Sequence, residues 1–205
     1  MDKMTKKIIG AFIAIIVVAA AILGVYSVMN RQAEKEAKED VLPTTEVGKI
    51  LAKDLELSYP ETPTEVIKLY WRINCCMYNE KKLSDENIEA LLKQLRLLYD
   101  EELLATESNS YEAMLENFKT DRKKYKDSQQ TISSAYIVQK NDTIVVKKVD
   151  NRDCTSIISS IMLTAKGDTT KTFEEFFCRK DSNGKWKILG WQQTTAGAAA
   201  EVGVQ

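Results

Sequence analysis

The distribution of apolar and polar residues changes twice along this chain, and each change predicts a different kind of structure. The first stretch begins at Ile8, ends at Met29 and holds no charged residue. At about 1.5 Å per residue, a helix of this length spans roughly 33 Å, which is enough to cross a hydrocarbon layer of about 30 Å. We therefore expect residues 1–29 to form a cytoplasmic tip and a transmembrane anchor in a lipid bilayer.

The charges that flank this stretch predict its orientation. Lys3, Lys6 and Lys7 precede the apolar run, which favours a cytoplasmic amino end and an extracytoplasmic remainder. A cleaved signal peptide is the alternative, because residues 19–21 are alanines and cleavage after Ser27 is also conceivable. In both cases the folded part lies outside the cytoplasm, and the expected location is a single-pass protein of the cell membrane.

Helical spacing dominates the chain after a charged stalk or linker at residues 30–45. Thr62-Pro63-Thr64-Glu65 reads as a capping box with proline at the first helical position. Ser84 and Asn109 are the expected N-caps of two later helices. The apolar periodicity predicts helices over residues 46–57, 63–79, 85–105 and 111–126.

The pattern changes to that of strands near Thr131. Segments rich in Ile, Val, Thr and aromatic residues are separated by short turn sequences, which require antiparallel neighbours. The predicted strands cover residues 131–139, 143–149, 155–166, 170–180 and 186–194. Residues 46–194 are therefore expected to form one α+β domain with helices packed on a curved antiparallel sheet. Residues 195–205 are expected to be a disordered tail.

Two resemblances extend this picture. Helices followed by a meander that closes on Trp186-Lys187-Ile188-Leu189-Gly190-Trp191 resemble the cone-shaped α+β fold of the nuclear-transport-factor and ketosteroid-isomerase superfamily. That resemblance implies a curved sheet that wraps around helices and leaves a conical cavity. The chain also resembles an uncharacterised family of clostridial single-pass membrane proteins, in Lys53-Asp54-Leu55-Glu56, Tyr59-Pro60, Thr62-Pro63, Tyr99-Asp100-Glu101-Glu102-Leu103 and the closing strand. This second resemblance implies a topology and no chemistry.

Composition excludes several classes of function. The chain has no histidine, which removes the commonest general base and the commonest transition-metal ligand. Its formal net charge of −1 gives no basic field for nucleic acid. Its four cysteines form no C-x-x-C motif, so we expect no metal site and no cofactor. Cys154 and Cys178 flank a predicted hairpin, where they form either a disulfide or two free thiols.

Two groups of residues are candidates for chemistry. Glu174 and Glu175 stand among aromatic residues in a predicted central strand, where neighbours point to opposite faces. One of them would enter the cone with a raised pKa and could act as a general base, unless both face solvent or pair with lysines. Tyr70, Tyr136 and Trp191 would line a pocket for an apolar ligand, unless they are plain core.

A single anchor, a sheet apolar on both faces and no nucleophile–base set favour a non-catalytic binding or assembly module of the cell envelope. Such a module would dock another envelope protein or itself. Its anchor and domain also resemble assembly components of type IV secretion and conjugation machines. The alternative function is the binding of a small apolar ligand, or simple carboxylate acid–base catalysis, in the cone.

Overall fold

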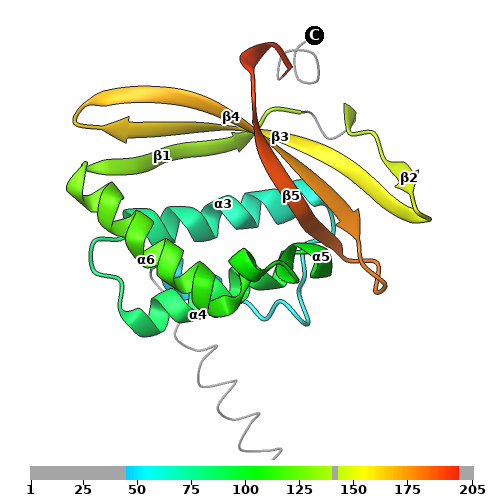
Figure 1. The fold of residues 1–205 in the computed structure, drawn as a ribbon, viewed down its shortest axis with the longest axis horizontal. Helices are drawn as coiled ribbons and strands as arrows, with labels where there is room; N and C mark the ends of the chain where they lie inside the picture. Colours follow the sequence, from blue (N-terminus) through cyan, green and yellow to red (C-terminus); the bar gives the residue numbers. More distant parts are fainter. Residues whose placement is uncertain (1–44, 140–142, 199–205) are drawn as a thin grey trace, which may run out of the picture. The chain divides into compact units, whose positions relative to one another are not determined.

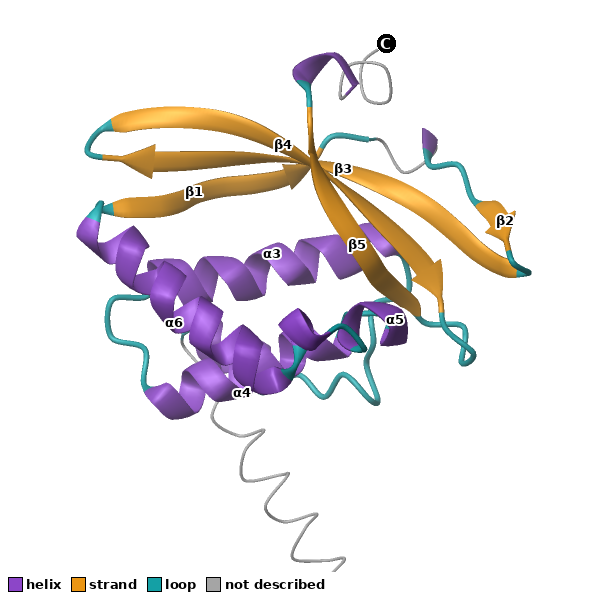
Figure 2. Ribbon diagram, in the orientation of Figure 1, coloured by secondary structure: helices purple, strands orange, loops and turns teal. Residues whose placement is uncertain are grey.

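The structure is a computed structural model that describes residues 45–139 and 143–198, which fold into helices and one antiparallel sheet (Figures 1 and 2). The helices are α2 (Glu46–Leu51), α3 (Pro63–Asn79), α4 (Asp85–Leu97), α5 (Glu101–Leu104), the 3₁₀ helix η1 (Glu107–Asn109) and α6 (Tyr111–Asp127). The strands are β1 (Gln130–Ile137), β2 (Lys147–Val149), β3 (Arg152–Ala165), β4 (Asp168–Lys180) and β5 (Trp186–Thr194). The α+β class is confirmed.

The predicted anchor, nearly all of the stalk and the last seven residues of the tail lie outside the described residues. Across 45–139 and 143–198, no helix combines the length and the apolar character needed to span a membrane. Residues 196–198, which belong to the predicted tail, form a helical turn.

The sheet is curved and does not close on itself, and the helices lie on one of its faces (Figure 2). Its strand order is β1-β3-β4-β5, and the short β2 pairs with the far end of β3 beyond β1. β1 and β2 therefore share one long partner. The prediction of a simple meander was wrong at this point, because β2 does not neighbour the strand that precedes it in sequence.

Two tight turns connect the strands of two hairpins, one short and one long. Lys166 and Gly167 connect β3 to β4 with φ values of 51° and 95°, and Asp150 and Asn151 connect β2 to β3 with φ values of 48° and 62°. Two consecutive residues at positive φ are typical of the type I′ turn, whose twist matches that of the flanking strands. The hairpin predicted between residues 155–166 and 170–180 is thus present, and Lys166 and Gly167 form its turn.

Helix α3 organises the interior because it packs against both the sheet and the other helices. Its amino end carries the predicted capping box: Thr62 accepts a hydrogen bond from the Glu65 backbone, and the Glu65 carboxylate accepts one from the Thr62 backbone. Trp71 of α3 is buried and donates from Nε1 to Ser159 Oγ over 3.0 Å. This bond joins α3 to the middle of β3.

The predicted helix 85–105 is interrupted, and the cause is long-range. After Leu97 the chain runs beside β5: Ile188 donates a backbone hydrogen bond to Leu98, and Asp100 donates one to Ile188, each over 2.8 Å. Asp100 then caps the separate helix α5. The apolar spacing through Tyr99 therefore serves packing against the sheet, although it reads as a continuation of the helix.

Three smaller boundaries also differ from the predictions. Helix α2 ends at Leu51, six residues before the predicted end. The N-cap of α6 is Ser110, because Asn109 belongs to η1. Residues 143–146 are not strand, so only the end of the predicted strand 143–149 pairs with β3.

Candidate functional site

Glu174 and Glu175 lie on opposite faces of the sheet, as strand geometry predicts. Glu174 pairs with Ser159, whose hydroxyl accepts from Trp71 of α3, so Glu174 faces the helices. Glu175 pairs with Ile158 and accepts a hydrogen bond from Gln192 over 3.1 Å. Of the two carboxyl groups, that of Glu174 therefore lies on the face that the helices cover, and that of Glu175 lies on the other face.

Aromatic side chains gather beside Glu174. The aromatic cluster consists of Tyr70, Trp71, Tyr99, Phe176 and Trp191. The ring of Tyr70 lies 5.0 Å from that of Phe176 and 5.9 Å from that of Trp191, measured between centroids. Tyr70, Tyr99 and Trp191 also line a cavity of about 210 Å³ between α3, α4, α6 and β5. Glu174 is near this cluster and is not among the residues that line the cavity.

The environment of Glu174 favours the neutral acid. Burial raises the pKa of Glu174 from its ordinary 4.5 to about 7. Its Oε2 atom is buried and has no hydrogen-bond partner among the described residues. Burial also raises the pKa of Tyr70 and Tyr125, and the Glu174 carboxylate contributes to both shifts. A carboxyl group in this state can hold or release a proton near neutral pH.

Tyr136 does not join Tyr70 and Trp191. It pairs with Ser160, the neighbour of Ser159, so its side chain lies on the other face of the sheet from Glu174. Tyr136 is 45% exposed, and the Lys171 Nζ atom lies 5.5 Å from the centre of its ring. The structure therefore brings together two of the three residues proposed for the pocket and separates the third.

Cys154 and Cys178 are free thiols on adjacent strands. Their register is offset by one residue, because Cys154 pairs with Arg179 and Thr155 pairs with Cys178. Cys178 belongs to the buried core, and burial raises the pKa of its thiol to about 12. Cys154 is half-buried. The strands thus leave the two sulfur atoms without the directly opposed position that a cross-strand disulfide needs.

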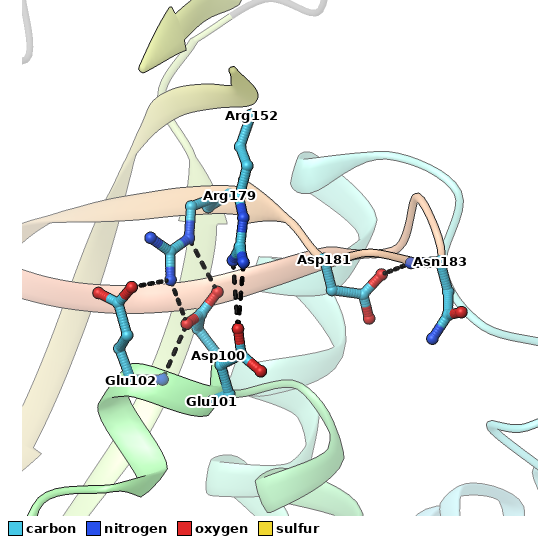
Figure 3. Close-up of polar contacts among 7 residues, drawn as sticks. All are labelled: Asp100, Glu101, Glu102, Arg152, Arg179, Asp181 and Asn183. Carbon is cyan, nitrogen blue, oxygen red and sulfur yellow. Dashed lines mark hydrogen bonds and ion pairs between the residues drawn. The ribbon is translucent and has the colours of Figure 1, made fainter. Parts of the chain in front are cut away.

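A buried ion pair holds the loop before α5 to the sheet (Figure 3). Asp100 is 1% exposed, and its two carboxylate oxygens accept from Arg179 Nη2 over 2.6 Å and from Nε over 3.1 Å. The same carboxylate accepts from the Glu102 backbone over 3.0 Å, and the Glu102 carboxylate lies 2.9 Å from Arg179. Burial alone would raise the pKa of Asp100, but the hydrogen bonds and charge of Arg179 lower it.

Figure 3 also shows a second arginine–carboxylate ion pair, between Arg152 and Glu101, and the turn that contains Asp181. Arg152 lies 3.2 Å from the Glu101 carboxylate, with both side chains open to solvent. Asp181 accepts from the backbones of Asn183 and Lys185 and so fixes the β4–β5 turn. These contacts join α5 to the start of β3 and hold the β4–β5 turn in place.

An apolar groove lies between residues 143–149 and the ends of β3, β4 and β5. This β2 groove has a volume of about 410 Å³. Phe177, on its wall, is 38% exposed, although its neighbours Phe176 and Cys178 are buried. Val149 is 54% exposed. The β2 groove is lined by Gln139, Thr143, Ile144, Val145, Lys147, Val149, Cys154, Thr155, Ser156, Phe177, Cys178 and Leu189.

Sequence reasoning missed both the Asp100–Arg179 pair and the β2 groove. The sequence Asp100-Glu101-Glu102 is an N-cap followed by two acids, a local signal for a new helix that the apolar spacing obscured. The groove has no comparable signal, because it depends on residues 143–146 leaving the sheet. Within 45–139 and 143–198, no group of three or more Cys, Asp or Glu side chains could hold a metal ion.

The comparisons with known proteins give a family and no activity. A family model described as a domain of unknown function (DUF6715) matches residues 1–191. No curated protein matches the chain. The matched range includes the residues of the aromatic cluster, Glu174, the Asp100–Arg179 pair and the β2 groove.

Proposed function

We propose that this chain, which belongs to the DUF6715 family, is a membrane-anchored binding module that displays its α+β domain outside the cytoplasm of a bacterial cell. Its partner is a protein of the cell envelope, either another chain or a second copy of itself. The β2 groove carries this proposal, because its apolar wall is exposed while the residues beside it are fully packed.

The composition of the β2 groove supports docking. Val145, Val149 and Phe177 leave apolar side chains in solvent around one concave site, and among the described residues that line it Lys147 alone is charged. Exposed apolar residues that gather around a concavity mark interaction sites more often than isolated ones do. Binding energy in protein interfaces concentrates in aromatic anchors within such pockets, which makes Phe177 the expected centre of the contact.

The assignment of the domain to a fold superfamily is part of the same proposal. We assign the domain to the cone-shaped nuclear-transport-factor-like superfamily, because helices precede a curved sheet whose inner face covers α3. The interior between α3 and the sheet is filled by large side chains such as Trp71, Ile157 and Phe176. A filled interior favours a domain that acts through its surface.

Site-specific cross-linking tests the docking. A photoreactive amino acid is placed at Phe177 in the full chain, in membranes of the native cell, and the product is sized and identified by mass spectrometry. We expect one defined adduct, and its mass distinguishes a second copy from another envelope protein. Phe177→Ser in an otherwise unmodified chain is expected to abolish the corresponding complex.

Leu57 provides the matched control. It is an apolar residue that is 81% exposed and lies outside the β2 groove. The photoreactive residue at Leu57 is expected to give no defined adduct, and Leu57→Ser is expected to leave the complex intact. Equal cross-linking from both positions, or a complex that survives Phe177→Ser, would overturn the docking proposal.

The membrane placement needs its own test, because it rests on the sequence of residues 8–29. Cell fractionation is expected to recover the chain with membranes, and a membrane-impermeant thiol reagent is expected to label Leu57→Cys in whole cells above the unmodified chain. Intact, unprocessed chain in the cytosolic fraction would contradict the placement.

The state of Glu174 favours a second candidate function, the binding of a small apolar ligand or acid–base catalysis in the cone. The Glu174 carboxyl combines a pKa of about 7, an unpartnered oxygen and adjacent aromatic rings. Thermal stabilisation by neutral aromatic compounds such as indole and phenol would support ligand binding. If Glu174→Gln leaves both this stabilisation and any turnover unchanged, the catalytic version fails.

A further inference from the structure

A second concave site lies between α3 and the edge strand β1. This α3–β1 pocket has a volume of about 490 Å³, within the roughly 300–1,000 Å³ typical of small-molecule sites. It shares only Gln139 with the β2 groove, so its occupancy is independent of the function proposed above. The α3–β1 pocket is lined by Thr64, Lys68, Trp71, Arg72, Cys75, Ala135, Tyr136, Ile137 and Gln139.

One face of α3 supplies the polar groups of this pocket. Thr64 and Lys68 are four residues apart, which places their side chains beside each other on the helix, about 5–6 Å apart at Cβ. Thr64 is only 3% exposed, yet its Oγ1 atom has no hydrogen-bond partner among the described residues. A buried hydroxyl without a partner is costly, and a ligand atom that pairs with it removes that cost.

The charged side chains among the described residues that line the pocket are all positive. None of the described residues that line it carries a carboxylate. Arg72 is already paired, since its Nη2 atom lies 2.6 Å from the Glu46 carboxylate. Lys68 has no ion-pair partner in the part of the chain that the structure describes. Its ammonium is therefore available to an anion at the mouth of the pocket.

The remaining wall is apolar. Trp71, Ala135 and Ile137 contribute an indole ring and aliphatic surface between the helix and the strand. The Trp71 indole nitrogen is engaged by Ser159, so the ring offers the pocket no free donor. A ligand that fits both parts of the site carries one anionic group and a short apolar body.

We infer that the α3–β1 pocket binds a small carboxylate with a short apolar body. One carboxylate oxygen accepts from the Lys68 ammonium and the other from the Thr64 hydroxyl, while the apolar body lies against Trp71, Ala135 and Ile137. One free ammonium and one free hydroxyl match the two oxygens of a single carboxylate. The neutralised Arg72 borders the site and does not compete for the ligand.

The test compares two compounds of equal size that differ in charge. The full chain is reconstituted in lipid nanodiscs, and isothermal titration calorimetry measures the Kd of 3-phenylpropanoate and of 3-phenylpropan-1-ol. Empty nanodiscs correct for partition into lipid. We expect the carboxylate to bind at least about tenfold more tightly than the alcohol, because only the carboxylate can pair with Lys68. Equal affinities, or no binding of the carboxylate, would overturn the inference.

Three variants locate the binding site. Lys68→Gln is expected to weaken carboxylate binding about tenfold and to leave the alcohol unaffected. Thr64→Val removes the hydroxyl at nearly constant volume and is expected to weaken the carboxylate several-fold without loss of fold. Lys93→Gln, at an exposed lysine of α4 outside the pocket, is the matched control and is expected to change neither Kd. Loss of affinity in Lys93→Gln equal to that in Lys68→Gln would show a general charge effect and refute the site.

Discussion

Asp100 and Glu174 are two buried carboxyl groups of one domain, and they differ in their hydrogen-bond partners. Asp100 receives two hydrogen bonds from Arg179 and one from the backbone of α5. Glu174 has a buried oxygen that receives none from the described residues. The pKa of Asp100 is consequently lowered, whereas that of Glu174 is raised to about 7. Burial alone does not determine the charge of a carboxyl group; its partners do.

The comparison also separates structure from potential function. A fully paired carboxylate holds two elements together, and its groups are not free for a ligand. An unpaired buried carboxyl group opposes folding once the pH is high enough to ionise it in the unfolded chain, by up to about 1.4 kcal/mol for each unit by which its folded-state pKa exceeds that of the unfolded chain. The raised pKa of Glu174 therefore identifies a carboxyl group whose ionisation opposes folding, whereas the ionised Asp100 supports it.

The largest expected effect comes from breaking the paired carboxylate. Asp100→Asn leaves the Arg179 guanidinium without its buried partner, which typically costs about 3–5 kcal/mol. Because Glu102 still lies 2.9 Å from Arg179, we expect about 3 kcal/mol of destabilisation. Urea unfolding followed by tryptophan fluorescence measures the change in the free energy of unfolding.

A double-mutant cycle provides the control for this prediction. Arg179→Met removes the charge and keeps an apolar side chain of similar length. The double variant Asp100→Asn, Arg179→Met is expected to lose less than the sum of the two single losses, because neither charge then remains unpaired. Strict additivity of the two losses would show that the pair contributes no coupling and would contradict this account.

Glu174→Gln is expected to act in the opposite direction. The folded-state pKa of about 7 exceeds the ordinary 4.5, so Glu174 stabilises the fold fully below pH 4.5 and this stability is lost as the pH rises to 7. At pH 8 glutamine is therefore expected to raise the free energy of unfolding by about 2–3 kcal/mol, with little change at pH 4. Urea unfolding between pH 4 and pH 8 measures both values.

Glu175→Gln is the matched control on the same strand. Glu175 lies on the other face of the sheet and accepts a hydrogen bond from Gln192. We expect it to change the free energy of unfolding by less than about 0.5 kcal/mol across the same pH range, as for most surface substitutions. A pH-dependent gain in Glu175→Gln, or none in Glu174→Gln, would reverse the assignment of the inward carboxyl.

Local chemistry explains which parts of the fold the sequence could predict. The capping box of Thr62 and Glu65 lies within four residues, and α3 begins where that pattern predicts and ends at Asn79, where the apolar spacing predicts. The strand Trp186–Thr194 was likewise predicted at its observed bounds. The break before α5 was not, because it depends on hydrogen bonds between Leu98, Asp100 and a strand some ninety residues later.

The same distinction between local and long-range information applies to the candidate site. That Glu174 and Glu175 face opposite sides follows from the two-residue period of a strand. Which of them faces inward depends on the register with Ser159 and on the contact of Ser159 with Trp71, and no local pattern contains that information. The Asp100–Arg179 pair joins residues 79 positions apart, so its partners could not be matched from spacing. Tyr136 was misassigned for the same reason, since its face depends on its pairing with β3.

The smallest expected effect tests whether burial gives the Asp100–Arg179 pair its strength. Glu101 and Arg152 form the same type of contact nearby over 3.2 Å, but the Glu101 side chain is 75% exposed. Water competes for both charges there, so exposed pairs contribute about 0–1 kcal/mol. We expect Glu101→Gln to lower the free energy of unfolding by less than about 0.5 kcal/mol at 0.15 M salt, measured by the same urea unfolding. A loss as large as that of Asp100→Asn would mean that the charge near α5 acts through the helix as a whole, since Glu101 also lies in its first turn. In that case the stabilising effect of Asp100 would come from its position at the start of a helix. The hydrogen-bond partners of Asp100 and Glu174 would then no longer explain why the two carboxyl groups differ.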